Sequence, residues 1–252
     1  MSENSRNSVE RRSPPTLLWG MIAHPRTTLE YLNRRGGASW WVPLVLAVIF
    51  VVVPVLVAAP ALARQAREAV VASQEEMAEQ RGMELSAEQQ AQVESIAASP
   101  FIIVVFPTVG SVIGLIVGWL AWAGALYLAG VALGGRSPFG SMFRTVVWAW
   151  LPYVIRGVLQ TIYILATGQV ITHPGLSGIA AESPVLSAFL SRIDLFLVWN
   201  LVLLIIGVGV VTHLPRRKSA IVTLGVWVLF TAVSLGFTAI SLMIGRQFGA
   251  LG

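Results

Sequence analysis

The chain has 252 residues, of which 56% are hydrophobic and only 12% are charged, and its mean hydropathy is +0.75. Soluble domains carry about 25% charged residues, so this composition indicates an integral membrane protein. Cysteine is absent, which excludes disulfides and thiol catalysis. The net charge is +5, and the membrane orientation predicted below accounts for this excess without nucleic-acid binding.

The first 40 residues predict elements on one side of the membrane. Residues 1–15 are polar and carry several arginines, which predicts a disordered cytoplasmic tail. Residues 16–38 predict short amphipathic helices lying on the membrane surface. Pro25 suits the first turn of a helix, Leu29 and Leu32 follow at helical spacing, and arginines and then glycines mark its end.

Five stretches are long and apolar enough to cross a bilayer, which takes about 20 residues each. Proline within the first predicts a kink near Pro54. The charge-free run 101–133 is too long for one upright span and too short for two. It therefore predicts one tilted span, kinked near Pro107. The predicted spans are residues 41–63, 104–130, 145–166, 193–211 and 220–244.

The segment between the first two spans, residues 64–99, is polar and rich in glutamate. It predicts a helical hairpin outside the bilayer, whose second helix starts with a capping box from Ser86 to Gln89. The predicted fold class is therefore an all-α membrane protein. It combines a five-transmembrane-helix bundle, an extracytoplasmic helical hairpin and an N-terminal cytoplasmic interfacial helix, with the membrane domain covering residues 39–246.

The distribution of basic residues predicts the orientation of the bundle. With the N-terminus in the cytoplasm, eleven of the 17 basic residues lie on the cytoplasmic side and four on the other. Short cytoplasmic loops carry such an excess of lysine and arginine. We therefore predict a multi-pass protein of the cell inner (plasma) membrane, with the N-terminus in the cytoplasm and the C-terminus outside.

The third span carries an arginine far from its ends. A charged side chain at membrane depth costs about 2.5–3.5 kcal/mol on insertion scales, so Arg156 needs a partner. Arg156 and Asn200 lie at a similar predicted depth, about 18 Å from the cytoplasmic ends of their spans. We expect a hydrogen bond between them, helped by Gln160 or by the carbonyl that Pro152 frees. Asp194 is about 9 Å further out and is the nearest acid. Two interpretations stay open: a register-holding arginine, or a water-lined or lipid-headgroup site.

Small and polar residues form two further patterns. Glycines recur every four residues in the second span and predict one face that a neighbouring helix can approach closely. They are Gly110, Gly114 and Gly118. Packing within one subunit and a dimer face are both compatible with them. Hydroxyl residues in the fifth span form a polar stripe that should face other helices. They are Thr231, Ser234, Thr238 and Ser241.

The sequence offers little for catalysis. The three histidines have no metal-ligand spacing, and Asp194 is the only aspartate. No nucleophile elbow, phosphate loop or zinc-protease motif is present. We therefore predict no catalytic residue, no metal and no cofactor, which argues against a hydrolase or a kinase.

Several stretches resemble one known family, the Yip1 domain, and the outer hairpin and tail resemble its bacterial members. They are LLWGMIAHPRTTLEYL (17–32), FGSMFRTVVWAWLPYVI (139–155), and SRIDLFLVWNLVLLIIGVGV (191–210) followed by SAIVTLGVWV (219–228). The matching positions include Asp194, Phe196, Trp199 and Gly207. The resemblance implies five spans with a cytoplasmic N-terminus. Eukaryotic relatives associate with Rab-type GTPases and with one another, but their long acidic N-terminal region is absent here, which argues against GTPase binding.

Together these patterns predict a non-enzymatic integral membrane organiser or adaptor. Its expected partners are membrane lipids and other membrane proteins or further copies of itself, and nucleic acid is not among them. The alternative is a small transporter, channel or permease subunit with a polar path around Arg156.

Overall fold

The computed structural model describes residues 12–35, 40–81, 86–171, 174–180 and 183–249, and these ranges contain only helices, turns and loops. Five of the helical stretches are long and apolar enough to cross a membrane, as predicted. The helices in chain order are α1 (Pro14–Ala23), α2 (Pro25–Arg35), α3 (Trp41–Arg81), α4 (Ala87–Ala97), η1 (Phe101–Val105), α5 (Phe106–Ala132), α6 (Phe139–Ala149), α7 (Leu151–Thr167), η2 (Ser177–Ala180), α8 (Pro184–Leu190), α9 (Leu195–Thr212) and α10 (Arg216–Gly249).

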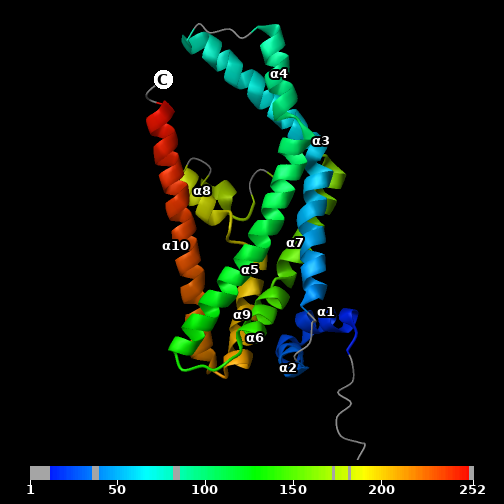
Figure 1. Cartoon of the computed structure of the whole chain (residues 1–252), viewed down its shortest axis with the longest axis vertical. Coiled ribbons are helices and arrows are strands. Elements are labelled where there is room, and N and C mark those ends of the chain that lie inside the picture. The colour runs from blue at the N-terminus through cyan, green and yellow to red at the C-terminus, as the bar shows by residue number, and fades with distance from the viewer. Residues whose placement is uncertain (1–11, 36–39, 82–85, 172–173, 181–182, 250–252) are drawn as a thin grey trace, which may run out of the picture.

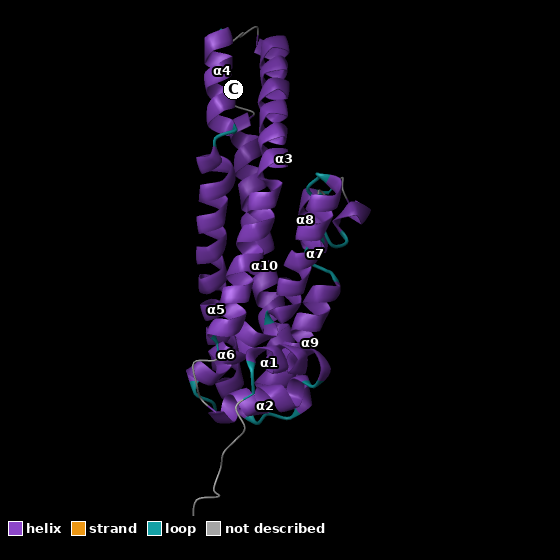
Figure 2. Cartoon of the chain, turned by 90° about the vertical axis from the view of Figure 1, so that its right-hand side faces the viewer, coloured by secondary structure: helices purple, strands orange, loops and turns teal. Residues whose placement is uncertain are grey.

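The bundle is elongated, and the chain runs along its length five times in alternating directions (Figure 1). The helices α1 and α2 lie at one end, which we call the α2 end. The hairpin of α3 and α4 and the last turns of α10 lie at the opposite end, which we call the α4 end (Figures 1 and 2). The two ends of the described chain therefore lie at opposite ends of the bundle. Which end faces the cytoplasm stays a prediction.

The two N-terminal helices pack against the bundle. The helix α1 begins at Pro14, inside the predicted tail, because proline suits the first turn of a helix; the rest of that tail, residues 1–11, lies outside the described residues. Met21 of α1 and Leu29 and Leu32 of α2 are buried, and α2 packs on α9 and α6. These helices are therefore part of the core as well as lying across one end of it.

The first span and the first arm of the hairpin form one continuous helix, α3, although the sequence suggested two. Pro54 lies inside α3 and has no N–H to donate to the carbonyl of Phe50. A Cβ at Gly157 of α7 would lie 2.7 Å from that carbonyl oxygen. The side-chain-free glycine thus lets α7 pack closely against α3 beside the freed carbonyl.

The hairpin and the second span also follow local rules. At the start of α4 the Ser86 Oγ accepts from the Gln89 N–H (3.3 Å) and the Gln89 side chain accepts from the Ser86 N–H (3.0 Å), which confirms the capping box. The second span widens into a π-helical turn, η1, directly before Pro107. Proline cannot donate to the preceding turn, so the helical hydrogen bonding is interrupted there, close to the predicted kink.

The hydrophobic core lies where α6 packs between α5 and α9, with α2 packed on α9 and α6, towards the α2 end. Its largest fully buried side chains include Trp119 of α5, Trp148 of α6 and Leu204 of α9. Gly207 of α9 has no side chain, which leaves room for Thr145 of α6. Half of the α9 span is buried, compared with 6% for the span that contains α5. The helix α9 is therefore central, whereas the first half of α5 is covered on little of its surface and its second half packs into the core.

Candidate functional site

A break between α6 and α7 frees a backbone carbonyl inside the bundle. Pro152 lies in the first turn of α7, and the Tyr153 N–H donates to the Trp150 carbonyl (2.9 Å) instead of to Ala149. The Ala149 carbonyl, which a continuous helix would pair with Tyr153, is thereby left open. Asn200 of α9, which is buried, donates its Nδ2 to this carbonyl at 2.7 Å. The buried amide therefore links α9 to the broken helix.

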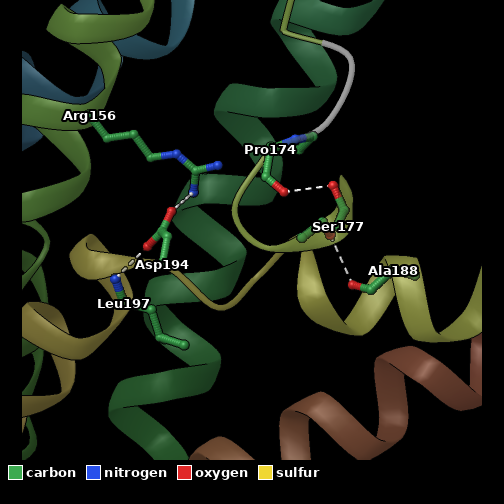
Figure 3. Close-up of polar contacts among 7 residues, drawn as sticks. Arg156, Pro174, Ser177, Ala188, Asp194 and Leu197 are labelled. Atoms are coloured by element: carbon green, nitrogen blue, oxygen red, sulfur yellow. Dashed lines mark hydrogen bonds and ion pairs between the residues drawn. The ribbon is translucent and has the colours of Figure 1, made fainter. Parts of the chain in front are cut away.

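Arg156, one turn beyond the break, forms an ion pair with Asp194. The guanidinium Nη1 lies 3.0 Å from the Asp194 Oδ2, and the two side chains are 23% and 14% exposed (Figure 3). Asp194 also caps α9, because its Oδ1 accepts from the Leu197 N–H at 2.8 Å. One carboxylate thus neutralises the partly buried arginine with one oxygen and caps the start of α9 with the other.

The loop before α9 has its own hydrogen bonds. Ser177 donates to the Pro174 carbonyl at 2.8 Å (Figure 3). Arg192 donates to the Ser234 hydroxyl of α10 at 2.6 Å. The loop that carries Asp194 is therefore held to α10 on one side and to Arg156 of α7 on the other.

The pairing differs from the sequence-based expectation. The predicted hydrogen bond between Arg156 and Asn200 is wrong, because Arg156 pairs with Asp194 and Asn200 donates to Ala149. Gln160 lies one turn from Arg156, and within the described ranges its side chain makes no hydrogen bond. The carbonyl that takes part in the cluster is that of Ala149, which is left open by Tyr153 and not by Pro152, and it serves Asn200.

The glycine face of α5 points away from the rest of the chain. A Cβ built at Gly110, Gly114 or Gly118 would meet nothing within 4 Å. The interpretation in which these glycines pack within one subunit is therefore wrong. The other interpretation, a dimer face, stays a prediction.

The polar stripe of α10 divides into two parts. Thr231 is buried, and Ser234 accepts from Arg192 of the loop before α9, so this part faces the rest of the bundle. Thr238 donates to the Ser234 carbonyl of its own helix, and Ser241 is exposed. For Ser241 the expectation was wrong.

No group of three histidine, aspartate or glutamate residues in the described part of the chain is placed to hold a metal ion.

A model of the Yip1 domain matches residues 19–238, nearly the whole chain. The chain belongs to the Yip1 family. No curated protein and no solved structure matches it. The positions that suggested this membership have physical roles in the Yip1 domain: Asp194 caps α9 and pairs with Arg156, Trp199 packs against the core, and Gly207 makes room for Thr145.

This Yip1 domain also has a cluster of basic residues that the sequence analysis did not predict. Arg26 and Arg34 of α2 and His213 and Arg216 of the α9–α10 turn line one open groove of about 890 Å³ at the α2 end. They are far apart in sequence and share no motif. The only sequence signal that pointed towards them was the excess of basic residues on the side of the bundle where α2 lies.

Proposed function

We propose that this protein is a non-enzymatic integral membrane organiser that binds other membrane proteins, through α5, and membrane lipids. The observation that carries the proposal is the open glycine face of α5, formed by Gly110, Gly114 and Gly118. Lipid tails are as apolar as leucine, so helices in a bilayer associate through close packing, for which small residues are suited.

The side chains beside these glycines support a docking surface for a transmembrane helix. Val109, Ile113 and Val117 are all more than half exposed and alternate with the glycines along α5. The glycines form a shallow strip between branched side chains, into which the ridge of another helix fits. The partner we propose is therefore a transmembrane helix of another membrane protein or of a second copy.

The alternative of a transporter has less support. Arg156 and Asp194 neutralise each other, and both oxygens of Asp194 already have partners. A charge that is paired and hydrogen-bonded in this way suits a structural role better than the transient binding of a transported ion.

Photo-crosslinking tests the proposal. A photoreactive residue at Val117 of α5 should crosslink to a membrane protein or to a second copy in native membranes. The same residue at Val228 of α10, which is equally exposed, serves as the control. Gly114→Leu fills the strip and should abolish the Val117 crosslink, whereas Gly225→Leu, at an equally open glycine of α10, should not. Equal crosslinking from both positions, or a Val117 crosslink that survives Gly114→Leu, would contradict the proposal.

A further inference from the structure

The groove at the α2 end has a charged rim and an apolar floor. It lies between α2 and the turn that joins α9 to α10, and its volume of about 890 Å³ is within the range of ligand sites. The floor is formed by Ile205, Ile206 and Val210 of the last turns of α9. His213, Leu214 and Pro215, which also line the groove, lie between the candidate spans Leu195–Thr212 and Arg216–Ile244.

The rim carries more positive than negative charge. Its only acid is Glu30, which is already paired with Arg26 at 3.1 Å. Arg34 and Arg216 are exposed, and neither has an ion pair or side-chain hydrogen bond within the described ranges. Two arginines, one from α2 and one from the start of α10, thus line the groove without an ion-pair partner within the described residues.

The backbone of the turn adds to this positive field. The helix α10 begins at Arg216, so its positively polarised first turn lies at the groove. His213 ends α9 with a left-handed backbone (φ 58°) and also lines the groove. The unpaired arginines, the helix start and the imidazole together suit a phosphate group.

The apolar floor of the groove runs along α9, and this direction favours a lipid over a free phosphate as the ligand. A soluble phosphate needs only the rim, but here the rim continues into exposed parts of Ile205 and Ile206 that follow α9 into the membrane. We infer that the groove binds an anionic phospholipid, with its phosphate between Arg34 and Arg216 and an acyl chain along α9. This deepens the lipid-binding half of the proposed function and uses none of the α5 face.

Lipid binding to the detergent-purified full chain tests this inference by native mass spectrometry, with phosphatidylglycerol and phosphatidylcholine of identical acyl chains as probes. We expect tighter binding of phosphatidylglycerol. One basic residue beside an anionic headgroup contributes about fivefold in affinity, so Arg34→Gln with Arg216→Gln should weaken that binding about 25-fold. The matched control is Arg136→Gln with Arg217→Gln. It removes two exposed arginines from the same end but outside the groove, and should change binding less than about twofold.

Further variants separate the lipid from a free anion. Ile205→Trp narrows the floor without changing the charge and should also weaken phosphatidylglycerol binding. Equal affinity for the two lipids, or equal losses in the two double variants, would overturn the inference. So would displacement of the lipid by inorganic phosphate alone, or full binding in Ile205→Trp. Gly114→Leu should keep lipid binding, so failure of the α5 surface and failure of the groove are distinguishable. The unfolding free energy of each variant shows whether it is folded.

Discussion

Removing the carboxylate of Asp194 should destabilise the bundle by an amount that the structure predicts. Asp194→Asn keeps an oxygen for the Leu197 N–H, since asparagine caps helices as well as aspartate does. It removes the ion pair, however, and leaves Arg156 without its partner. Breaking a fully buried pair costs about 3–5 kcal/mol, whereas an exposed pair contributes about 0–1 kcal/mol. The two side chains are 23% and 14% exposed, so we expect a loss at the lower end of the first range, about 3 kcal/mol in the free energy of unfolding.

Two more variants separate the ion pair of this carboxylate with Arg156 from its role as the cap of α9. Asp194→Ala also removes the helix cap and should cost about 1 kcal/mol more than Asp194→Asn. Asp194→Asn combined with Arg156→Met leaves no charge, and uncharged replacements of a buried pair are often close to neutral. The double variant should therefore be more stable than Asp194→Asn alone. A double-mutant cycle on reversible unfolding in mixed detergent and dodecyl sulfate micelles measures this coupling, which we expect to be at least about 2 kcal/mol.

The control is an ion pair of almost the same length at the surface. Arg26 and Glu30 lie 3.1 Å apart, but their side chains are 78% and 36% exposed. Glu30→Gln should cost no more than about 0.5 kcal/mol. If Asp194→Asn costs no more than this control, or if the losses in the double-mutant cycle simply add, then Arg156 does not depend on Asp194 and our account of the site is wrong.

Three other predictions concern the interior and the orientation. Asn200→Leu leaves the buried Ala149 carbonyl without a donor and should lower the unfolding free energy by about 1–3 kcal/mol; an unchanged value would mean that the carbonyl has another partner. Gly157→Ala forces α7 away from α3 and should cost about 1–3 kcal/mol, whereas Gly225→Ala, in open space, should be neutral or stabilising; equal effects would contradict the close helix contact. A cysteine at Ser95 should react with an impermeant thiol reagent from outside the cell, and labelling only from the cytoplasm would reverse the predicted orientation.

The architecture was largely predictable because it follows from local properties of the chain. A span is recognised from the length and hydropathy of one stretch, and all five were found in this way. The capping box at Ser86 likewise depends on residues within one turn. The continuity of α3 through Arg81 was missed, because the change from apolar to polar residues marks the end of a span and does not mark the end of a helix.

The pairing inside the bundle was harder to predict, because it depends on how helices bend and how far side chains reach. Depth was counted along straight helices, which put Asn200 beside Arg156 and Asp194 beyond it. The break at Pro152 and the long arginine side chain change which groups meet. Asp194 was correctly identified as the nearest acid, but the carbonyl in the cluster is that of Ala149, which is left open by Tyr153 and not by Pro152. The assignment of partners needed three-dimensional coordinates.

Two surfaces of the bundle, the glycine face of α5 and the groove at the α2 end, stay open within the described chain. At the break between α6 and α7 the polar groups pair with one another: the freed Ala149 carbonyl accepts from Asn200, and the partly buried Arg156 pairs with Asp194. Groups satisfied inside the chain have little left for a ligand. By contrast, the glycines of α5 have no neighbour within 4 Å, and Arg34 and Arg216 have no counter-charge within the described residues. In the function that we propose, these two exposed surfaces present binding groups to other helices and to lipid headgroups.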